Sequence, residues 1–316
     1  MNNIYSKLLF TLVVWMAVLS CGRHGEEVDI HRLDLEISHG VVPEDSVMYK
    51  AAEKLFEICG YGPVYFLSVC DYADKSSIRE HRDAVEREFA DMSRERKSLG
   101  ELFGRMRRDL PGADIPRVFT VISPYTQSVF VADSAVYLGL NHYLGTAYPP
   151  YEPFPEYVRR LKVRDRIPVD IAEAIIRTSY PFKSGGDYPQ VLARMAYEGA
   201  VAEAVMRMAD VDEQESLGYN DEDYSWLNDN EHEIWDALVS RQMLFNTDRD
   251  MIRSLVGVGP STNVISASSP GRAGRYAGHR LVVSYLKANP SVSLESLLSP
   301  GFYENPSLLS SAKYNP

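Results

Sequence analysis

The stretch between residues 116 and 140 limits the fold more than any other part of the chain, because its hydrophobic pattern is that of strands. Three short runs there, PRVFTVIS, SVFVAD and AVYLGL, are rich in β-branched and aromatic residues. Turn-forming residues separate them, first Pro124-Tyr125-Thr126 and then Asp133-Ser134. The rest of the chain has mostly helical spacing. The sequence therefore predicts an α+β fold that is mostly helical, with a small antiparallel sheet followed by a helical half.

Apolar residues on both sides of this sheet recur at steps of three and four, which is the spacing of amphipathic helices. Before the sheet we expect an extended lead-in at 30–35, a helix from about 46 to 58 and a long charged helix from 76 to about 108. After the sheet we expect helices over 168–180, 188–209, 220–243, 248–256 and 273–288. The sequence contains no internal repeat, so residues 28–316 are expected to form a single domain.

The N-terminus has the layout of a secretory signal. Lys7 is followed by an uninterrupted apolar run over residues 8–19, which stops at Ser20-Cys21. About twelve apolar residues are too few for a membrane-spanning helix, which needs roughly twenty. The tetrapeptide ending at Cys21 resembles the lipobox of bacterial lipoproteins. Residues 1–20 are therefore predicted to be a lipoprotein signal peptide, Cys21 the lipidation site and residues 21–27 a tether. The alternative is an ordinary cleaved signal with an incidental cysteine.

Acidic residues outnumber basic ones by 44 to 33, and the net charge is −11. Nucleic acids and anionic membrane surfaces attract clustered cations, so neither is expected as a partner. Membrane contact is expected through the covalent lipid on Cys21, and no cofactor is expected. Cys59 and Cys70 flank a glycine-containing turn. They are expected either to form a disulfide, which an oxidising compartment permits, or to be two small buried apolar residues.

Two glutamates fall on apolar helix faces after the predicted sheet. Glu173 lies four residues after Val169, and Glu198 lies three residues after Met195, so each points the same way as its apolar neighbours. A buried carboxylate is costly unless it is paired or protonated. The two acids are therefore either a candidate functional site or structural ion pairs, satisfied by an arginine such as Arg272 or Arg275.

Other signs of chemistry are weak. His232 and Asp236 are spaced to share a metal, but they are expected at the edge of their helix and have no third partner. There is no phosphate-binding glycine loop and no GxSxG nucleophile motif in the sequence. The glycines of SPGRAGRYAGHR, Gly274 and Gly278, are four apart, which favours close approach of a neighbouring helix over a nucleotide site.

A series of ordered motifs runs through the second half of the chain: LGLNHYLG (138–145), YPPY (148–151), YEG (197–199), NEHEIW (230–235), LFNTD (244–248), SPGRAGRYAGHRLV (269–282), NPSVSLESLL (289–298) and SAKYNP (311–316). With these motifs the chain resembles the gliding-motility lipoprotein family GldB of Bacteroidetes, over roughly residues 28–316. The resemblance implies a lipoprotein of the gliding-motility and associated protein-secretion apparatus. Its implied partners are other envelope proteins, or a peptide held in a groove.

The GldB family is in turn similar in layout to zinc peptidases of the gluzincin type, in which an HExxH helix follows a small sheet and a later helix supplies a glutamate. On this chain the HExxH positions fall on 172–176 and the later glutamate on Glu198. Ala172 and Ile176 would replace both imidazole ligands, so the resemblance implies no zinc and no catalytic residue. It implies a vestigial site or groove formed by Ala172, Glu173, Ile176, Glu198 and Tyr276.

The expected activity is therefore binding by an inactive, peptidase-like domain at the cell envelope. The alternative is a metal-dependent hydrolase with non-standard ligands, drawn from Glu173, Glu198, Glu231 and either His232 or His142. Gly22, and not aspartate, follows the predicted lipidation site, which favours the outer membrane by analogy with other lipoproteins.

Overall fold

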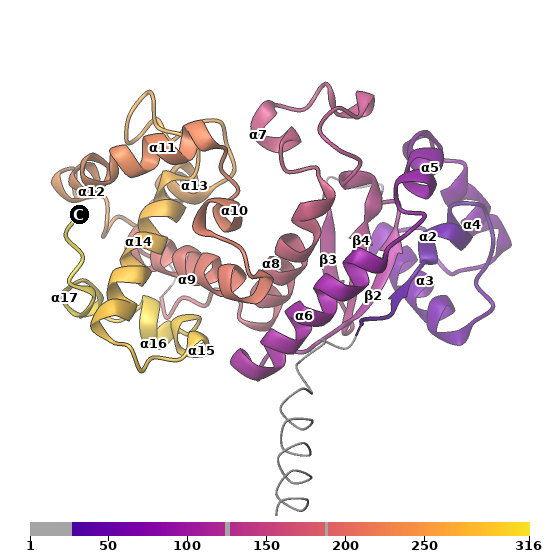
Figure 1. Cartoon of the computed structure of the whole chain (residues 1–316), viewed down its shortest axis with the longest axis horizontal. Coiled ribbons are helices and arrows are strands. Elements are labelled where there is room, and N and C mark those ends of the chain that lie inside the picture. Colours follow the sequence, from indigo (N-terminus) through magenta and orange to yellow (C-terminus); the bar gives the residue numbers. More distant parts are fainter. Residues whose placement is uncertain (1–26, 124–126, 187–188) are drawn as a thin grey trace, which may run out of the picture.

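A computed structural model describes residues 27–123, 127–186 and 189–316 of the chain (Figure 1). The predicted signal peptide 1–20 and the lipidation site Cys21 lie outside these residues. Within the described part, none of the helices combines the length and apolar character that crossing a membrane requires.

The predicted sheet is present, but it is mixed and not antiparallel. Its four strands are β1 (Ile30–His31), β2 (Arg117–Val121), β3 (Val129–Ala132) and β4 (Ala135–Gly139), in the order β1-β2-β4-β3. β3 and β4 form the expected antiparallel hairpin, whose turn residues Asp133 and Ser134 have φ of 48° and 58°. β2, however, pairs with β4 in parallel, and β1 pairs with β2 in parallel.

The helices before the sheet differ from the expectation in two places. They are α2 (Leu33–Ile37), α3 (Ser46–Cys59), α4 (Phe66–Ala73), α5 (Ser76–Glu88) and α6 (Ser93–Asp109). The lead-in is extended only at β1, because helix α2 follows it directly. The long charged helix is in fact two helices. It breaks where Phe89 and Met92 turn into the core and the Asp91 carboxylate accepts a hydrogen bond from the Ser93 N–H, at 2.8 Å.

A largely irregular segment joins the sheet to the helical half. It contains the short helices η1 (Leu140–His142), η2 (Pro149–Tyr151), α7 (Glu156–Arg159) and η3 (Arg164–Arg166). Figure 1 shows α7 above the junction between the sheet and the later helices.

The helical half begins with α8 (Ile167–Ser179), which lies between the sheet and the next helix, α9 (Val191–Ala209) (Figure 1). The remaining helices are α10 (Glu213–Leu217), α11 (Asp221–Asp229), α12 (Glu231–Ser240), α13 (Arg249–Val256), α14 (Ala273–Ala288), α15 (Leu294–Leu297), α16 (Pro300–Tyr303) and α17 (Leu308–Ala312). The helix expected over 220–243 is therefore two helices, α11 and α12, divided at Asn230, whose side chain bonds the carbonyl of Trp226.

The centre of the helical half is the contact between α9 and α14. α9 is buried on nearly all sides, as expected of a helix that is apolar around its whole circumference. A Cβ on Gly278 would lie 2.0 Å from the Met195 carbonyl oxygen, and one on Gly274 would lie 2.9 Å from Leu255. The prediction that these two glycines permit close helix packing is therefore confirmed. This close packing brings the N-terminal turn of α14 toward α8.

The buried apolar side chains of the described residues form one contiguous cluster that extends from Ile30 to Ala312. Cys59 and Cys70 are both half-buried on the sheet side, and no disulfide joins them.

Candidate functional site

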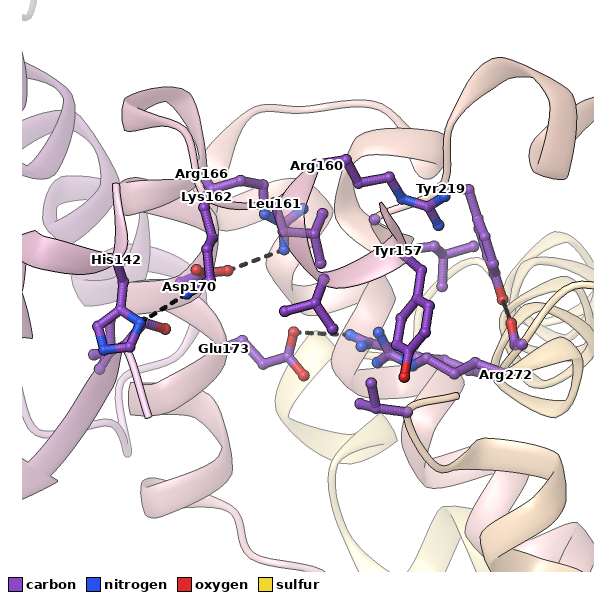
Figure 2. A pocket seen from close by; sticks show the side chains of 18 of the residues that line it. His142, Tyr157, Arg160, Leu161, Lys162, Arg166, Asp170, Glu173, Tyr219 and Arg272 are labelled. Atoms are coloured by element: carbon purple, nitrogen blue, oxygen red, sulfur yellow. Dashed lines mark hydrogen bonds and ion pairs between the residues drawn. The ribbon is translucent and has the colours of Figure 1, made fainter. Parts of the chain in front are cut away.

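A cavity of about 460 Å³ lies between the irregular segment 157–166, helix α8 and the N-terminal end of α14. The rest of the cavity wall is formed by strand β3, the loop that follows α10 and the loop 258–260. Figure 2 shows His142 and Lys162 toward one end of this cavity, and Tyr219 and Arg272 toward the other. A cavity of this size could hold a drug-sized ligand or a few residues of a peptide.

The lining of the cavity is strongly basic. Six cationic side chains line it: Arg160, Lys162, Arg166, Arg177, Arg272 and Arg275. Three carboxylates line it: Asp170, Glu173 and Asp223. The excess of positive charge is local, because the chain as a whole carries −11. The cavity therefore attracts anions in a protein that otherwise repels them.

One face of α8 supplies the charged floor of the cavity. Asp170, Glu173, Ala174 and Arg177 all line it, and their spacing of three, four and seven residues places them on one side of the helix. Asp170 accepts hydrogen bonds from Tyr143 at 2.9 Å and from Arg166 at 3.0 Å. Burial raises the pKa of Asp170, and the charge of Arg166 opposes that rise.

Glu173 is held by two arginines. Arg177 Nε donates to its Oε1 at 2.9 Å, and Arg275 Nη2 donates to its Oε2 at 3.0 Å. Burial disfavours the ionised form of this carboxyl, but the charges and hydrogen bonds of the two arginines outweigh burial and lower its pKa to about 2. Glu173 is therefore a fully paired carboxylate at neutral pH, and the predicted pairing with Arg275 is confirmed.

Glu198 of α9 is buried, and the same Arg177 binds its carboxylate in a bidentate ion pair. Arg177 Nη1 lies 3.1 Å from its Oε1 while Nη2 bonds its Oε2, and Arg194 Nη2 lies 3.0 Å from Oε1. Burial again acts against the ionised form, but these arginines lower the pKa of Glu198. Glu173 and Glu198 thus both contact the guanidinium group of Arg177.

The remaining residues of the predicted groove do not line the cavity. Ala172 and Ile176 lie on the opposite side of α8, completely buried in the core. Tyr276 is also completely buried, and its hydroxyl lies 3.0 Å from Asn228 Oδ1. Of the five predicted residues, only Glu173 contributes to the cavity wall.

The side chains considered as alternative metal ligands are engaged elsewhere. Glu231 bonds Arg280 and Tyr314 at the far end of α14. His232 and Asp236 are exposed, and His232 Nε2 lies 3.2 Å from Asp236 Oδ2. His142 lines the cavity, with Lys162 Nζ 2.9 Å from its Nδ1. Across residues 27–123, 127–186 and 189–316, no three His, Cys, Asp or Glu side chains are placed to hold a metal ion together.

Two cations of the cavity make no ion pair with a carboxylate among the described residues. Lys162 is buried against His142 and the rings of Tyr151 and Phe154, and burial lowers its pKa. Arg272 is half-buried at the residue preceding α14, in the left-handed backbone region with φ of 65°. Of the two arginines named as alternative partners of the glutamates, Arg275 is the one that pairs with Glu173.

The sequence contained a signal for this basic lining that the pattern analysis missed. Five basic residues occur between 159 and 166, in the segment RRLKVRDR. Three of them, Arg160, Lys162 and Arg166, line the cavity, while Arg164 turns away to pair with Glu95. A cationic run in an acidic chain is a stronger pointer to the site than the two glutamates.

Together these features define a mostly helical α+β protein with a basic cavity beside the central helix pair. The sequence model of one family, described as gliding motility protein GldB, matches residues 26–316. The chain therefore belongs to the GldB family of gliding-motility lipoproteins, and a location at the cell envelope fits this membership. Searches of curated proteins and of solved structures gave no match.

Proposed function

We propose that this chain is a lipid-anchored envelope protein of the gliding-motility machinery and its associated secretion apparatus, and that it acts by binding and not by catalysis. The observation that carries the second part is the position of Arg177 between Glu173 and Glu198. Together with Arg194 and Arg275, Arg177 neutralises both acids, which leaves neither of them free to hold a metal ion.

The lining of the cavity supports a different proposed position for the zinc motif on α8. Zinc ligands on a helix lie four residues apart and face the cleft. On α8, Glu173 and Arg177 have that spacing, face the cavity and approach Glu198. We therefore propose that the motif corresponds to 173–177, one residue later than predicted. In this alignment a permanent cation, Arg177, takes a ligand position, and Ala174 takes the position of the general base.

Binding would occur with the domain held at the membrane. We propose that Cys21 carries the lipid, that the outer membrane is the site of anchoring, and that the cavity receives a segment of another envelope protein. Peptide segments bind commonly in grooves of this kind, with a few polar side chains fixing their direction.

The test is site-specific photocrosslinking in cells. A photoreactive amino acid would replace Val258, which lines the cavity and is 73% exposed, and in a control strain Val239 of α12, which is exposed but lies outside the cavity. We expect Val258 to capture an envelope protein of the motility or secretion machinery, identified by mass spectrometry, and Val239 not to capture it. The same capture from both positions, or none from Val258, would contradict the proposal.

A further inference from the structure

The charge of the cavity limits the chemical class of the ligand that it can bind. Most of its arginines are paired: Arg177 with Glu173 and Glu198, Arg166 with Asp170, and Arg160 with Asp223 at 2.7 Å. After this pairing, Arg272 makes no ion pair with a carboxylate among the residues described, and Lys162 interacts with Asp170 only at longer range. A protein does not gain stability from gathering unpaired cations in one cavity, since like charges repel. The excess is therefore available for a ligand.

Arg272 precedes α14 and Arg275 lies three residues later, in the first turn of the same helix. The side chain of Arg275 is 2% exposed and pairs with Glu173 through only one of its nitrogens. The Nε atoms of both arginines are buried and make no hydrogen bond with the residues described. α14 has sixteen residues, so the positive end of its dipole adds to the two guanidinium charges. Buried donors without acceptors cost free energy until an acceptor arrives.

The backbone around Arg272 is built to hold this geometry. Arg272 adopts a left-handed conformation that side chains rarely take, and a Cβ on the preceding Gly271 would lie 1.9 Å from the Gly259 carbonyl oxygen. Thr262 Oγ1 accepts the N–H of Ala273, which fixes the start of the helix. Strain of this kind persists where the surrounding structure enforces it, and it is concentrated at functional sites.

The rest of the lining indicates which kind of anion fits beside the guanidinium groups. Apolar and aromatic side chains, Leu161, Val258 and Tyr157, line the same space and suit a hydrocarbon or peptide portion next to the charged group.

We propose that the cavity is a carboxylate-binding site in which Arg272, with Arg275 behind it, holds the carboxylate of a peptide. This rests on the proposed binding function and specifies its ligand. The carboxylate has two sources with the same chemistry, the C-terminus of a chain or an acidic side chain. Arginine matches either source, because its planar fork bonds both oxygens of a carboxylate.

The test is calorimetric titration of the full chain in detergent with four probes. N-acetyl-trialanine carries a C-terminal carboxylate, its amide carries none, N-acetyl-Ala-Asp-Ala amide carries a side-chain carboxylate, and inorganic phosphate represents the other class of anion. We expect the first or third probe to bind and the neutral amide not to bind. The stronger of the two carboxylate probes identifies the source.

Two variants assign the binding to the site. Arg272→Gln should weaken carboxylate binding about tenfold or more, since a charge-assisted hydrogen bond is lost. Arg253→Gln, on the exposed face of α13 with its side chain 81% exposed, makes the same charge change outside the cavity and should leave binding unchanged. Arg272 makes no ion pair with the part of the chain that the structure describes, so thermal unfolding should show Arg272→Gln folded.

The inference would be overturned by no binding of either carboxylate peptide, by equal binding of the amide, or by unchanged binding in Arg272→Gln. Tighter binding of phosphate than of both peptides would also overturn it and assign the cavity to phosphate. None of these results would affect capture of a partner at Val258. The binding function and the carboxylate specificity can therefore fail separately.

Discussion

Two arginines in the same cavity wall have opposite surroundings. Arg177 lies between Glu173 and Glu198 and uses all three of its nitrogens on carboxylates. Arg272 has no carboxylate partner in the described part of the chain, and its Nε is buried without a hydrogen bond. We infer from this difference that Arg177 has a structural role and Arg272 a binding role within one site. Arg177 neutralises carboxylates that folding buries, whereas the charge of Arg272 is available to bind a ligand.

Burial explains why the two arginines should respond differently to substitution. Removing one member of a buried ion pair leaves the other charge uncompensated, which costs several kcal/mol. Removing a cation that has no partner relieves repulsion and loses only packing. The comparison therefore predicts a large loss of stability at Arg177 and almost none at Arg272.

The largest effect is expected from Arg177→Met, which keeps most of the side-chain volume and removes the charge. Glu198 would keep only Arg194, and Glu173 only Arg275. We expect the free energy of unfolding to fall by about 3 kcal/mol, the lower end of the range for buried pairs, because Arg177 is partly exposed. Urea denaturation followed by circular dichroism measures it. Arg253→Met, at an exposed position of α13, is the control and should change stability by less than about 0.5 kcal/mol.

If Arg177→Met unfolds at the same urea concentration as the control, the paired cluster is not structural. The contrast with Arg272 would then disappear.

The second effect concerns another fully paired group, His279 of α14. Its ring nitrogens contact Glu213 Oε1 and, at 2.9 Å, Glu203 Oε2, while Arg207 pairs with Glu203 and Arg280 with Glu213. Burial opposes protonation of the ring, but hydrogen bonds and charge from the two glutamates raise its pKa above 6.5. Its contribution to stability is complete below pH 6.5 and is lost as the pH rises through the folded-state pKa.

We therefore expect the melting temperature to fall as the pH is raised from about 6.5. The free energy of unfolding should fall by roughly 1.4 kcal/mol for each unit by which the pKa is raised. Glu203 and Glu213, whose pKa values are lowered by the same contacts against the effect of burial, lose their contribution only in acid. His279→Gln cannot titrate and should remove this neutral-range slope. A wild-type melting temperature that rises over the same interval would contradict the assignment.

The smallest effect is expected from Arg272→Gln. Because Arg272 has no carboxylate partner in the residues described, the substitution should change the free energy of unfolding by less than about 0.5 kcal/mol. Loss of repulsion among the cations of the cavity favours a small gain. The measurement is the same urea series used for Arg177→Met. A loss comparable to that of Arg177→Met would show that Arg272 has a structural partner and remove the basis for the carboxylate site.

Local pattern predicted the elements of the fold better than their pairing. The hairpin of β3 and β4 followed from the turn at Asp133-Ser134, a short-range signal. The parallel pairing of β2 with β4 did not, because the strand β3 lies between them in the chain and only tertiary packing decides which edge each strand occupies. The break before α6 had a signal in Asp91, which bonds the first N–H of that helix.

The site was predicted in part for a similar reason. Buried glutamates stand out in an apolar pattern, so Glu173 and Glu198 were found, and Arg275 was correctly named as a partner. The family resemblance, and not the spacing, placed Ala172 and Ile176 in the groove, but both belong to the core. The basic residues of 159–166 lie on an irregular segment, where no periodicity indicates direction.

The proposed non-catalytic function requires that Arg177 occupy the place where a related peptidase would hold its metal. Metal analysis of the purified full chain, prepared without added zinc, tests it directly, with Glu198→Ala measured alongside. We predict zinc far below one ion per chain in both proteins, because both glutamates are already neutralised by arginine. One zinc ion per chain in the wild type that disappears in Glu198→Ala would contradict the account and favour a metal-dependent hydrolase.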